Sequence, residues 1–461
     1  MLFNSFDFLI FFVIVVFIFW SLKGQVQKCF LLLSCIFFYA YWNPPFILLL
    51  FFTISVNYFC ALEINKSETL FRKKLFLYLA ICGSLIPLIF FKYINFLITI
   101  FLNLKSRETS TNQLFLEVFL PLGISFFTFQ ALAYTIDTYR KNIKPKKSLI
   151  DFALFISFFP QLIAGPIMRA TEFFPQLEAP KYLNFKNIEG GIYLILWGLL
   201  KKVVIADNLS FIVNSYFSDP ETGFFTAWYA IYAFAFQIYC DFSGYCDIAL
   251  GCAIILNFKI PLNFRQPYLS SNITSFWHNW HITLSNWFRD YLYIPLGGSR
   301  MGLWGFYRNI FIVMVVAGLW HGANYTFVVW GAYHGVLLIL HKIYSRFFRV
   351  EIPRLVGIFL TFHLVCLGWI FFRAENIGSA WFIFSSAINL PGINVENFFL
   401  NKNLFLLIVP LIFLQIAERR FSLKQNFINF PFAFKSVFIS VSLIVITIFG
   451  IHANDFIYFE F

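Results

Sequence analysis

The sequence predicts an all-α protein that crosses a membrane many times. Of its 461 residues, 60% are hydrophobic and only 12% are charged, whereas globular domains carry about 25% charged residues. The mean hydropathy is +0.76. Apolar runs close to the length of a spanning helix, about 20 residues, recur along the whole chain. These observations exclude a soluble globular protein, a disordered chain and a small disulfide-stabilised protein.

Apolar runs in the first half of the chain predict its first membrane helices. The run at 6–22 has no basic region before it and no small-residue cleavage site after it, so we expect a retained span rather than a signal peptide. The run at 29–42 is shorter and ends at Asn-Pro-Pro, which fits either a short span or a re-entrant segment. Further spans are expected at 46–62, 75–101, 116–138 and 150–166.

The second half continues this pattern to a total of about ten to twelve membrane segments. The run at 224–256 is long enough for two short passes or one bent pass. The other expected spans are 189–205, 309–340, 355–373, 403–418 and 434–452. Since no repeat, linker or soluble region interrupts them, we expect a single membrane domain over 1–461. It comprises N-terminal helices in 1–256, a distinct segment at 257–308 and C-terminal helices in 309–461.

The formal net charge of +12 comes from short basic loops between the apolar runs. Such loops are typical of the cytoplasmic side of membrane proteins, so we expect a lipid bilayer and not nucleic acid as the partner. Placing Lys23, Lys28 and the loops at 63–74 and 140–147 in the cytoplasm puts the N-terminus outside.

The segment 257–308 departs from the spanning pattern because it mixes tryptophan with arginine and histidine. Trp277, Trp280 and Trp287 alternate there with charged side chains. A lipid-facing span cannot carry this mixture. We expect short helices that lie along the membrane interface or dip into a water-filled cavity lined by protein.

His321 is the first candidate for a catalytic group. It stands in a strongly apolar run between Gly318 and Gly322, which permit close approach of a backbone or a ligand. Ionisable groups at membrane depth are costly and often functional. A neutral imidazole is well suited to remove a proton from a hydroxyl near neutral pH. From this context alone, a catalytic base and a histidine that bonds a neighbouring helix are equally supported.

His278 and His281 are spaced to share one side of a helix. Metal binding is weakly supported because no HExxH glutamate, carboxylate or thiol ligand accompanies them, so no metal centre is predicted. A polar group near His321 is the better use for one of them. If 311–341 were one straight helix, His334 would face away from His321.

The remaining intramembrane polar groups leave alternatives open. His363 and His452 are expected to pack or to form hydrogen bonds. Asp241 and Asp247 stand in an apolar run and require partners, and helix packing and cavity lining are equally supported for them. Proline and glycine at 121–125 and 160–166 predict broken or kinked helices.

Two motifs resemble the membrane-bound O-acyltransferase (MBOAT) superfamily, most nearly its bacterial branch of alginate and peptidoglycan O-acetylating membrane subunits. They are WHITLSNWFRDYLYIPLGG at 280–298 and GLWHGA at 318–323. Further agreement lies at 121–140, 160–169, 240–251, 263–268 and 456–461. The resemblance implies a ring of tilted helices around a thinned centre. A tunnel would join a cytoplasmic donor pocket to an outward funnel in the bacterial cytoplasmic membrane.

The resemblance also implies the chemistry. It points to His321 as the catalytic histidine and to His281 as a second active-site group, at a position that His or Asn/Asp residues occupy elsewhere in the superfamily. His278 stands where relatives commonly carry a basic residue, so no catalytic role is expected for it. The implied donor is acetyl-CoA or another cytoplasmic acetyl thioester. The implied final acceptor is a cell-envelope polysaccharide, reached through an extracytoplasmic esterase-like acetyltransferase partner.

Peptidoglycan is the favoured acceptor because the 68 phenylalanines are compatible with an AT-rich genome, in which a dedicated alginate system is less expected. Alginate-like exopolysaccharide or another envelope glycan is the alternative. From a different class, a transporter or channel would use the intramembrane His and Asp residues as a proton relay. No inverted repeat supports that class. A third class, a non-catalytic scaffold, predicts that His321 is replaceable.

Overall fold

The computed structural model describes residues 1–104, 115–348, 352–389, 402–421, 426–451 and 456–457. Within these ranges the regular structure is helical and contains no strand, which confirms the predicted all-α class. The chain separates into two compact units. The first consists of Met1–Phe185 with Cys252–Pro261, and the second of Lys186–Gly251 with Leu262–Phe461.

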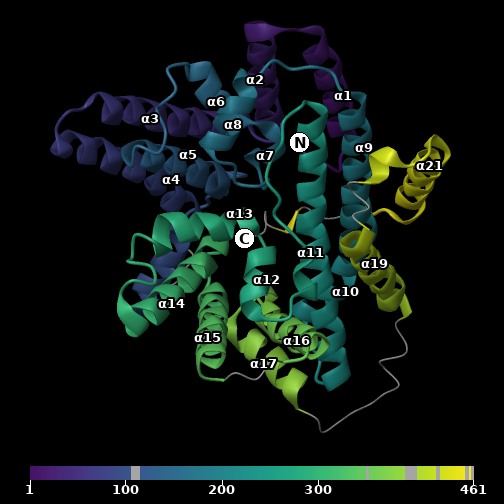
Figure 1. Cartoon of the computed structure of the whole chain (residues 1–461). Helices are drawn as coiled ribbons and strands as arrows, with labels where there is room; N and C mark the ends of the chain where they lie inside the picture. The colour runs from purple at the N-terminus through teal and green to yellow at the C-terminus, as the bar shows by residue number, and fades with distance from the viewer. Residues whose placement is uncertain (105–114, 349–351, 390–401, 422–425, 452–455, 458–461) are drawn as a thin grey trace. The chain divides into compact units, whose positions relative to one another are not determined.

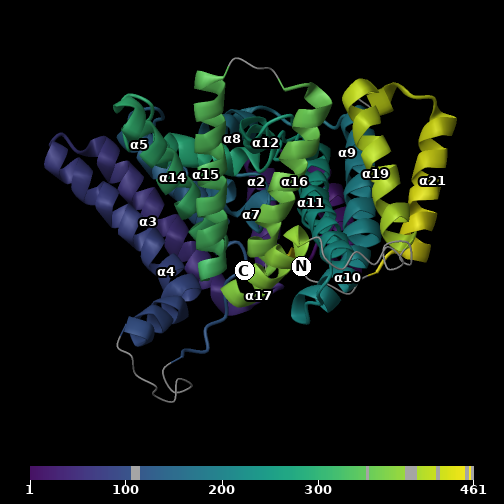
Figure 2. The same ribbon diagram turned by 90° about the horizontal axis from the view of Figure 1, so that it is seen from below.

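The first unit contains the N-terminal helices. In chain order they are α1 (Phe6–Ser21), α2 (Gly24–Ala40), η1 (Pro44–Phe46), α3 (Ile47–Lys66), α4 (Leu70–Leu104), α5 (Ile124–Tyr139), α6 (Leu149–Ser157), α7 (Phe159–Leu162) and α8 (Ala170–Glu178). Helices α3, α4 and α5 lie side by side (Figures 1 and 2). A buried polar contact joins them, since Asn57 donates to Ser84 Oγ and accepts from Thr135 Oγ1, each at 2.8 Å. Such hydrogen bonds stabilise helix association within a bilayer.

Two of the predicted helix breaks are present in the first unit. The run at 116–138 becomes helical only at Ile124, because Pro121 and the left-handed Gly123 (φ 73°) precede it. Within the run at 150–166, helix α6 ends at Ser157, and Phe158 (φ −52°, ψ 107°) separates it from the short helix α7. Closely packed phenylalanine rings surround this break, with Phe158 5.4 Å from Phe173 and 5.0 Å from Phe258 between ring centroids.

The second unit is organised around α11 (Figure 1). Its helices are α9 (Phe185–Leu199), the π-helical turn η3 (Leu200–Ala206), α10 (Asp207–Ser218), α11 (Phe224–Ile255), η4 (Pro267–Leu269), α12 (Ile273–Asn279), α13 (Ile282–Phe288), the π-helical turn η5 (Arg289–Tyr293), α14 (Gly302–His321), α15 (Tyr325–Phe347), α16 (Arg354–Arg373), α17 (Ile377–Ile388), α19 (Lys402–Phe421), η6 (Phe427–Asn429) and α21 (Phe432–Phe449). The run at 224–256 is thus one continuous helix. Its 18-residue apolar window is 89% buried.

Helices α9 and α11 approach each other at glycines. A Cβ atom at Gly198 would lie 2.5 Å from the carbonyl oxygen of Gly244, and one at Gly244 would lie 2.7 Å from that of Gly198. Any larger residue at either position would therefore push the helices apart. Small residues allow such close backbone contact between membrane helices.

The described residues include seven helices that are long and apolar enough to cross a membrane: α3 with η1, α4, α11, α14, α15, α16 and α21. Three shorter apolar helices, α1, α2 and α17, accompany them. Between Phe258 and Met301 only short helical segments occur. The prediction that 257–308 does not form a lipid-facing span agrees with this arrangement up to Met301, whereas residues 302–308 belong to α14, one of the seven helices.

One premise of the sequence analysis is wrong, since 311–341 is not one straight helix. Helix α14 ends at His321, Gly322 is extended, and Asn324 caps α15 by accepting a hydrogen bond from Thr326 N at 3.2 Å. The two helices form a hairpin (Figure 2). It is tightly packed because a side chain at Gly318 would collide with the carbonyl oxygen of Phe327.

Candidate active site

His321 is the last residue of α14 and lies against the helix hairpin. Its side chain is buried, with 4% of the residue exposed. Three aromatic rings surround the imidazole, those of Trp320, Trp330 and Phe372, with centroids 5.0, 5.2 and 5.2 Å away. All three meet it edge to face. The helix end and its aromatic neighbours thus hold one imidazole in a region that excludes bulk water.

His281 occupies the turn between α12 and α13. Its backbone is left-handed (φ 42°, ψ 55°), which is uncommon for a residue other than glycine and often marks functional sites. The side chain is 1% exposed. This burial lowers the pKa of the imidazole to about 3, so His281 is neutral at physiological pH.

The two predicted histidines contact the same indole. The Trp320 ring centroid lies 5.0 Å from that of His321 and 6.0 Å from that of His281. Phe242 of α11 packs against the other side of His281 at 4.7 Å. The fold therefore brings His281 and His321 into one aromatic cluster, although 39 residues of sequence separate them.

His334 joins this cluster, contrary to the sequence analysis. The break after His321 turns α15 back along α14, and His334 lies 5.0 Å from the Trp330 ring that also contacts His321. Trp277 covers it at 5.1 Å. His334 is fully buried, and neither ring nitrogen has a hydrogen-bond partner among the described residues. The Gly-Ala-Asn sequence at 322–324 was the feature that could have predicted a helix break. This break brings His334 to the aromatic cluster.

Asn263 fixes the turn that carries His281. Its backbone carbonyl accepts from Ile282 N at 3.0 Å, and its side-chain oxygen accepts from Thr283 Oγ1 at 2.6 Å and Thr283 N at 3.3 Å. Asn263 is 1% exposed. In the sequence, Asn263 stands out only as part of the motif at 263–268, because its contact depends on a turn that the sequence does not reveal.

A cavity of about 540 Å³ adjoins the aromatic cluster at Trp277. Three basic side chains line it, His278, Arg289 and Lys342, together with the polar residues Ser285 and Asn286. The lining includes no carboxylate, although Arg289 Nε donates to the neighbouring Asp290 at 2.8 Å. The apolar side chains of Phe306, Ile310, Val313, Met314 and Leu338 also line it. Such a lining suits a ligand with both an anionic and an apolar part.

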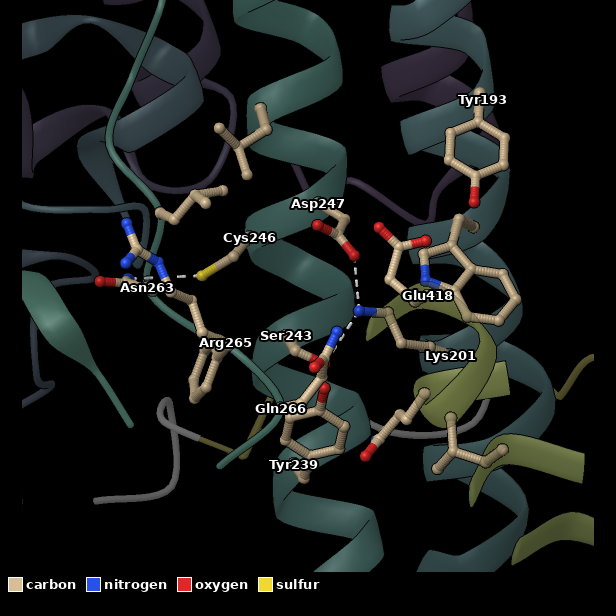
Figure 3. A pocket seen from close by; sticks show the side chains of 16 residues that line it. Tyr193, Lys201, Tyr239, Ser243, Cys246, Asp247, Asn263, Arg265, Gln266 and Glu418 are labelled. Carbon is tan, nitrogen blue, oxygen red and sulfur yellow. Dashed lines mark hydrogen bonds and ion pairs between the residues drawn. The ribbon is translucent and has the colours of Figure 1, made fainter. Parts of the chain in front are cut away.

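A second cavity, of about 370 Å³, is polar and charged (Figure 3). Lys201 of the π-helical turn η3 reaches α11, where it donates to Asp247 at 2.5 Å and to Ser243 at 3.0 Å. Glu418 of α19 and Arg265 also line this cavity. Phe264, another lining residue, packs against Phe242 at 5.0 Å and so stands one ring away from His281.

The two aspartates left open by the sequence have different roles. Asp247 lines the cavity and pairs with Lys201. Asp241 is buried and pairs with Lys202 at 2.8 Å, and it accepts from Ile457 N at 2.7 Å. Lys202 also pairs with Asp207 at 2.8 Å. Lys201 thus pairs with an acidic residue at the cavity, whereas Lys202 pairs with acidic residues buried in the helix packing.

The other candidate histidines have structural contacts. His363 Nε2 bonds to Tyr232 Oη at 2.8 Å and its Nδ1 to the Phe359 carbonyl at 2.7 Å, in agreement with the predicted packing role. His341 Nδ1 bonds to Thr274 Oγ1 at 2.9 Å. His452 lies outside the described residues. Across the part of the chain that the structure describes, no three His, Cys, Asp or Glu side chains are grouped as metal ligands.

Comparison with known proteins identifies relatives over most of the chain. The family model of the membrane-bound O-acyltransferases matches residues 82–379, which include both predicted catalytic histidines. A peptidoglycan O-acetyltransferase of Helicobacter pylori is 39% identical over 398 residues, covering 80% of this chain and 75% of the relative. A probable alginate O-acetylase of Pseudomonas aeruginosa is 36% identical over 385 residues, covering 83% and 74%.

A more distant relative is the teichoic acid D-alanyltransferase of Bacillus subtilis. It is 27% identical over 276 residues, covering 55% of this chain and 69% of the relative. These bacterial relatives, the family model and the apolar helices agree with one another. The chain therefore belongs to the membrane-bound O-acyltransferase family and is a multi-pass acyltransferase of the bacterial cytoplasmic membrane.

Proposed function

We propose that this acyltransferase moves an acetyl group from a cytoplasmic acetyl thioester across the membrane for O-acetylation of a cell-envelope polysaccharide, with His321 as the general base. The observation that carries the proposal is the shared contact of His321 and His281 with Trp320 in a buried aromatic cluster. A water-poor setting favours acyl transfer to an alcohol over hydrolysis of the thioester.

In the proposed reaction, His321 accepts the proton of the acceptor hydroxyl as the oxygen attacks the carbonyl carbon of the thioester. A carbon–oxygen bond forms and the carbon–sulfur bond breaks. The departing thiolate takes up the proton that His321 returns, so the histidine ends the cycle neutral. His281, which burial keeps neutral and which contacts Trp320, orients the reacting groups.

The cavity at Trp277 supports an anionic thioester such as acetyl-CoA as the donor. CoA carries phosphates at one end and its thioester at the end of a less polar arm. Arg289 and Lys342 supply positive charge for the phosphates, and the His278 ring can donate a hydrogen bond to them. Trp277, which also lines this cavity, contacts Trp330, the neighbour of His321.

The names of the relatives support an envelope polysaccharide as the final acceptor. One is a peptidoglycan O-acetyltransferase and several are probable alginate O-acetylases. Peptidoglycan is our choice, in line with the composition argument above. The immediate acceptor in this proposal is a hydroxyl on an extracytoplasmic esterase-like transferase, which passes the acetyl group on to the glycan.

The test is the amount of acetate that mild base releases from purified sacculi and from extracellular polysaccharide. Wild type, a deletion strain and a strain carrying His321→Ala are compared at equal membrane expression. Both mutants are expected to lose sacculus acetate. Loss from the exopolysaccharide alone would overturn the choice of peptidoglycan. Unchanged acetate in His321→Ala would overturn the mechanism.

Asn263 offers a separate test of how His281 is positioned. Asn263→Ala removes the oxygen that accepts both hydrogen bonds from Thr283, and leaving buried donors unpaired costs about 1–3 kcal/mol. We expect kcat to fall more than KM rises, because the turn carrying His281 shifts while the basic cavity persists. Initial rates with purified protein over a range of donor concentrations measure both constants.

Two further variants complete the Asn263 test. Asn263→Asp retains the side-chain oxygen and is expected to recover part of the rate. Asn279→Ala is the matched control, because it removes a partly buried bond to Ser270 Oγ. If Asn263→Ala left kcat unchanged, Asn263 would not be a positioning residue.

A further inference from the structure

The first unit contains a third cavity, of about 390 Å³, which is separate from the two cavities described above. It lies between the α1–α2 turn and the segment that follows α8. Lys23, Lys28 and Lys181 line it, and Glu178 is the one carboxylate in its lining. A cavity of this size accommodates a small charged group rather than a single water molecule.

The carboxylates near this cavity are already paired. Lys28 bonds to Asp151 at 3.1 Å, and Glu178 pairs with Lys146. Within the described part of the chain, neither Lys23 nor Lys181 has a carboxylate partner. The cavity therefore holds two positive charges that no protein anion balances.

Lys181 is held in a defined position. Its Nζ donates to the carbonyl oxygen of Asn257 at 2.7 Å and lies 3.6 Å from the centroid of the Phe258 ring. Burial lowers the pKa of this ammonium group to about 8, because desolvation disfavours its charged form. An anion in the cavity would supply the missing compensation.

The surroundings of the cavity indicate a lipid. On α1, the exposed apolar side chains follow helical spacing along one face, at Phe6, Ile10, Val13 and Phe17, and so form a lipid-facing stripe. This stripe runs toward the end of α1 at which Phe19 and Lys23 line the cavity. After α8, Tyr182 is 70% exposed beside Lys181. Aromatic and basic residues together are typical of the membrane–water interface.

The positions of these lysines also indicate which leaflet of the membrane the cavity faces. Lys23 and Lys28, at the start of α2, are assigned to the cytoplasm by the positive-inside rule, and so is Lys146 of the 140–147 loop. The cytoplasmic leaflet is rich in anionic lipids, which basic residues near the surface attract. We propose that this cavity binds the phosphate-bearing headgroup of an anionic phospholipid, with one acyl chain lying along the exposed face of α1.

The test is lipid binding by the purified full-length protein in detergent, measured by native mass spectrometry during titration with phosphatidylglycerol. Phosphatidylcholine and inorganic phosphate are titrated separately. We expect phosphatidylglycerol to bind in preference to both. Each of Lys23→Gln and Lys181→Gln should weaken it about fivefold, which corresponds to ~1 kcal/mol per basic residue near the headgroup.

Lys66→Gln is the matched control. Lys66 is also a cytoplasmic-side lysine of the first unit, but its side chain is 67% exposed and pairs with Glu63. Equal weakening by Lys66→Gln would overturn the site in favour of diffuse surface attraction. Inorganic phosphate binding as tightly as the lipid would overturn the lipid as occupant, and equal binding of phosphatidylcholine would overturn the role of the lysines. The Lys23 side chain makes no capping hydrogen bond at the start of α2, so Lys23→Gln removes no such bond and remains informative if Lys181→Gln unfolds, which a thermal melt reveals.

Discussion

Replacing His321 with alanine is expected to lower the acetyl-transfer rate by about 10²- to 10⁴-fold, the range that a positioned general base contributes. The imidazole lies at the end of α14, where the rings of Trp320, Trp330 and Phe372 exclude the water that would otherwise replace it as a base. His321→Gln should be no better, because an amide cannot accept the proton. The measurement is transfer of labelled acetyl from acetyl-CoA in membranes that contain equal amounts of each variant.

His281 and His321 are expected to act together in catalysis. His281→Ala alone should lower the rate, and the double variant should be scarcely slower than His321→Ala, because residues that act together are not additive. His363→Ala is the control, since that histidine bonds Tyr232 and Phe359 instead of contacting Trp320. Equal losses in His363→Ala and His321→Ala would indicate that the losses come from misfolding rather than from chemistry.

Replacing Lys202 with methionine is expected to cost about 3–5 kcal/mol of stability, the usual result of removing one partner from a buried ion pair. Lys202 holds Asp207 and Asp241, and the three side chains are 7%, 2% and 3% exposed. Without the lysine, two carboxylates would remain buried with no cation between them. Thermal unfolding of the purified protein in detergent should show a lowered midpoint.

Two comparisons separate this charge effect from a loss of packing. The triple variant Lys202→Met, Asp207→Asn and Asp241→Asn contains no uncompensated charge at the cluster and should recover most of the lost stability. Lys435→Met should change little, because its partner Glu189 is 44% exposed and exposed pairs contribute about 0–1 kcal/mol. A triple variant as unstable as the single one would mean that the lysine stem, rather than its charge, stabilises the packing.

The membrane class and the two main candidate residues were accessible from the sequence. Hydropathy is a local property, so apolar runs predicted the helices directly. His281 and His321 stand in motifs that the resemblance singled out, and the structure brings both to Trp320. Their catalytic roles remain proposals. The position of His334 was not predictable under the straight-helix premise, because a turn of only three residues between α14 and α15 reverses the chain direction.

The pairing of the buried charges could not be predicted from the sequence, for a different reason. In a regular α-helix, Lys201 and Lys202 would point about 100° apart, and nothing in the sequence indicates a π-helical turn. The cavity proposed to bind a lipid is lined by residues near 23–28 and by residues near 177–182. These two segments come together only through the tertiary packing of the first unit. Hydrophobic periodicity carries no information about either feature.

The π-helical turn at Leu200–Ala206 also determines which length changes the chain can tolerate. A π-helical turn accommodates an additional residue, so deleting one residue there would convert it to regular α-helix and leave α9 and α10 in nearly the same rotational phase. Gly198 would then keep its contact with Gly244, and the change would fall on Lys201 and Lys202 within the turn. Homologous chains that lack one residue between Gly198 and Asp207 should therefore keep the close packing of α9 on α11 but lose one of the two lysine ion pairs.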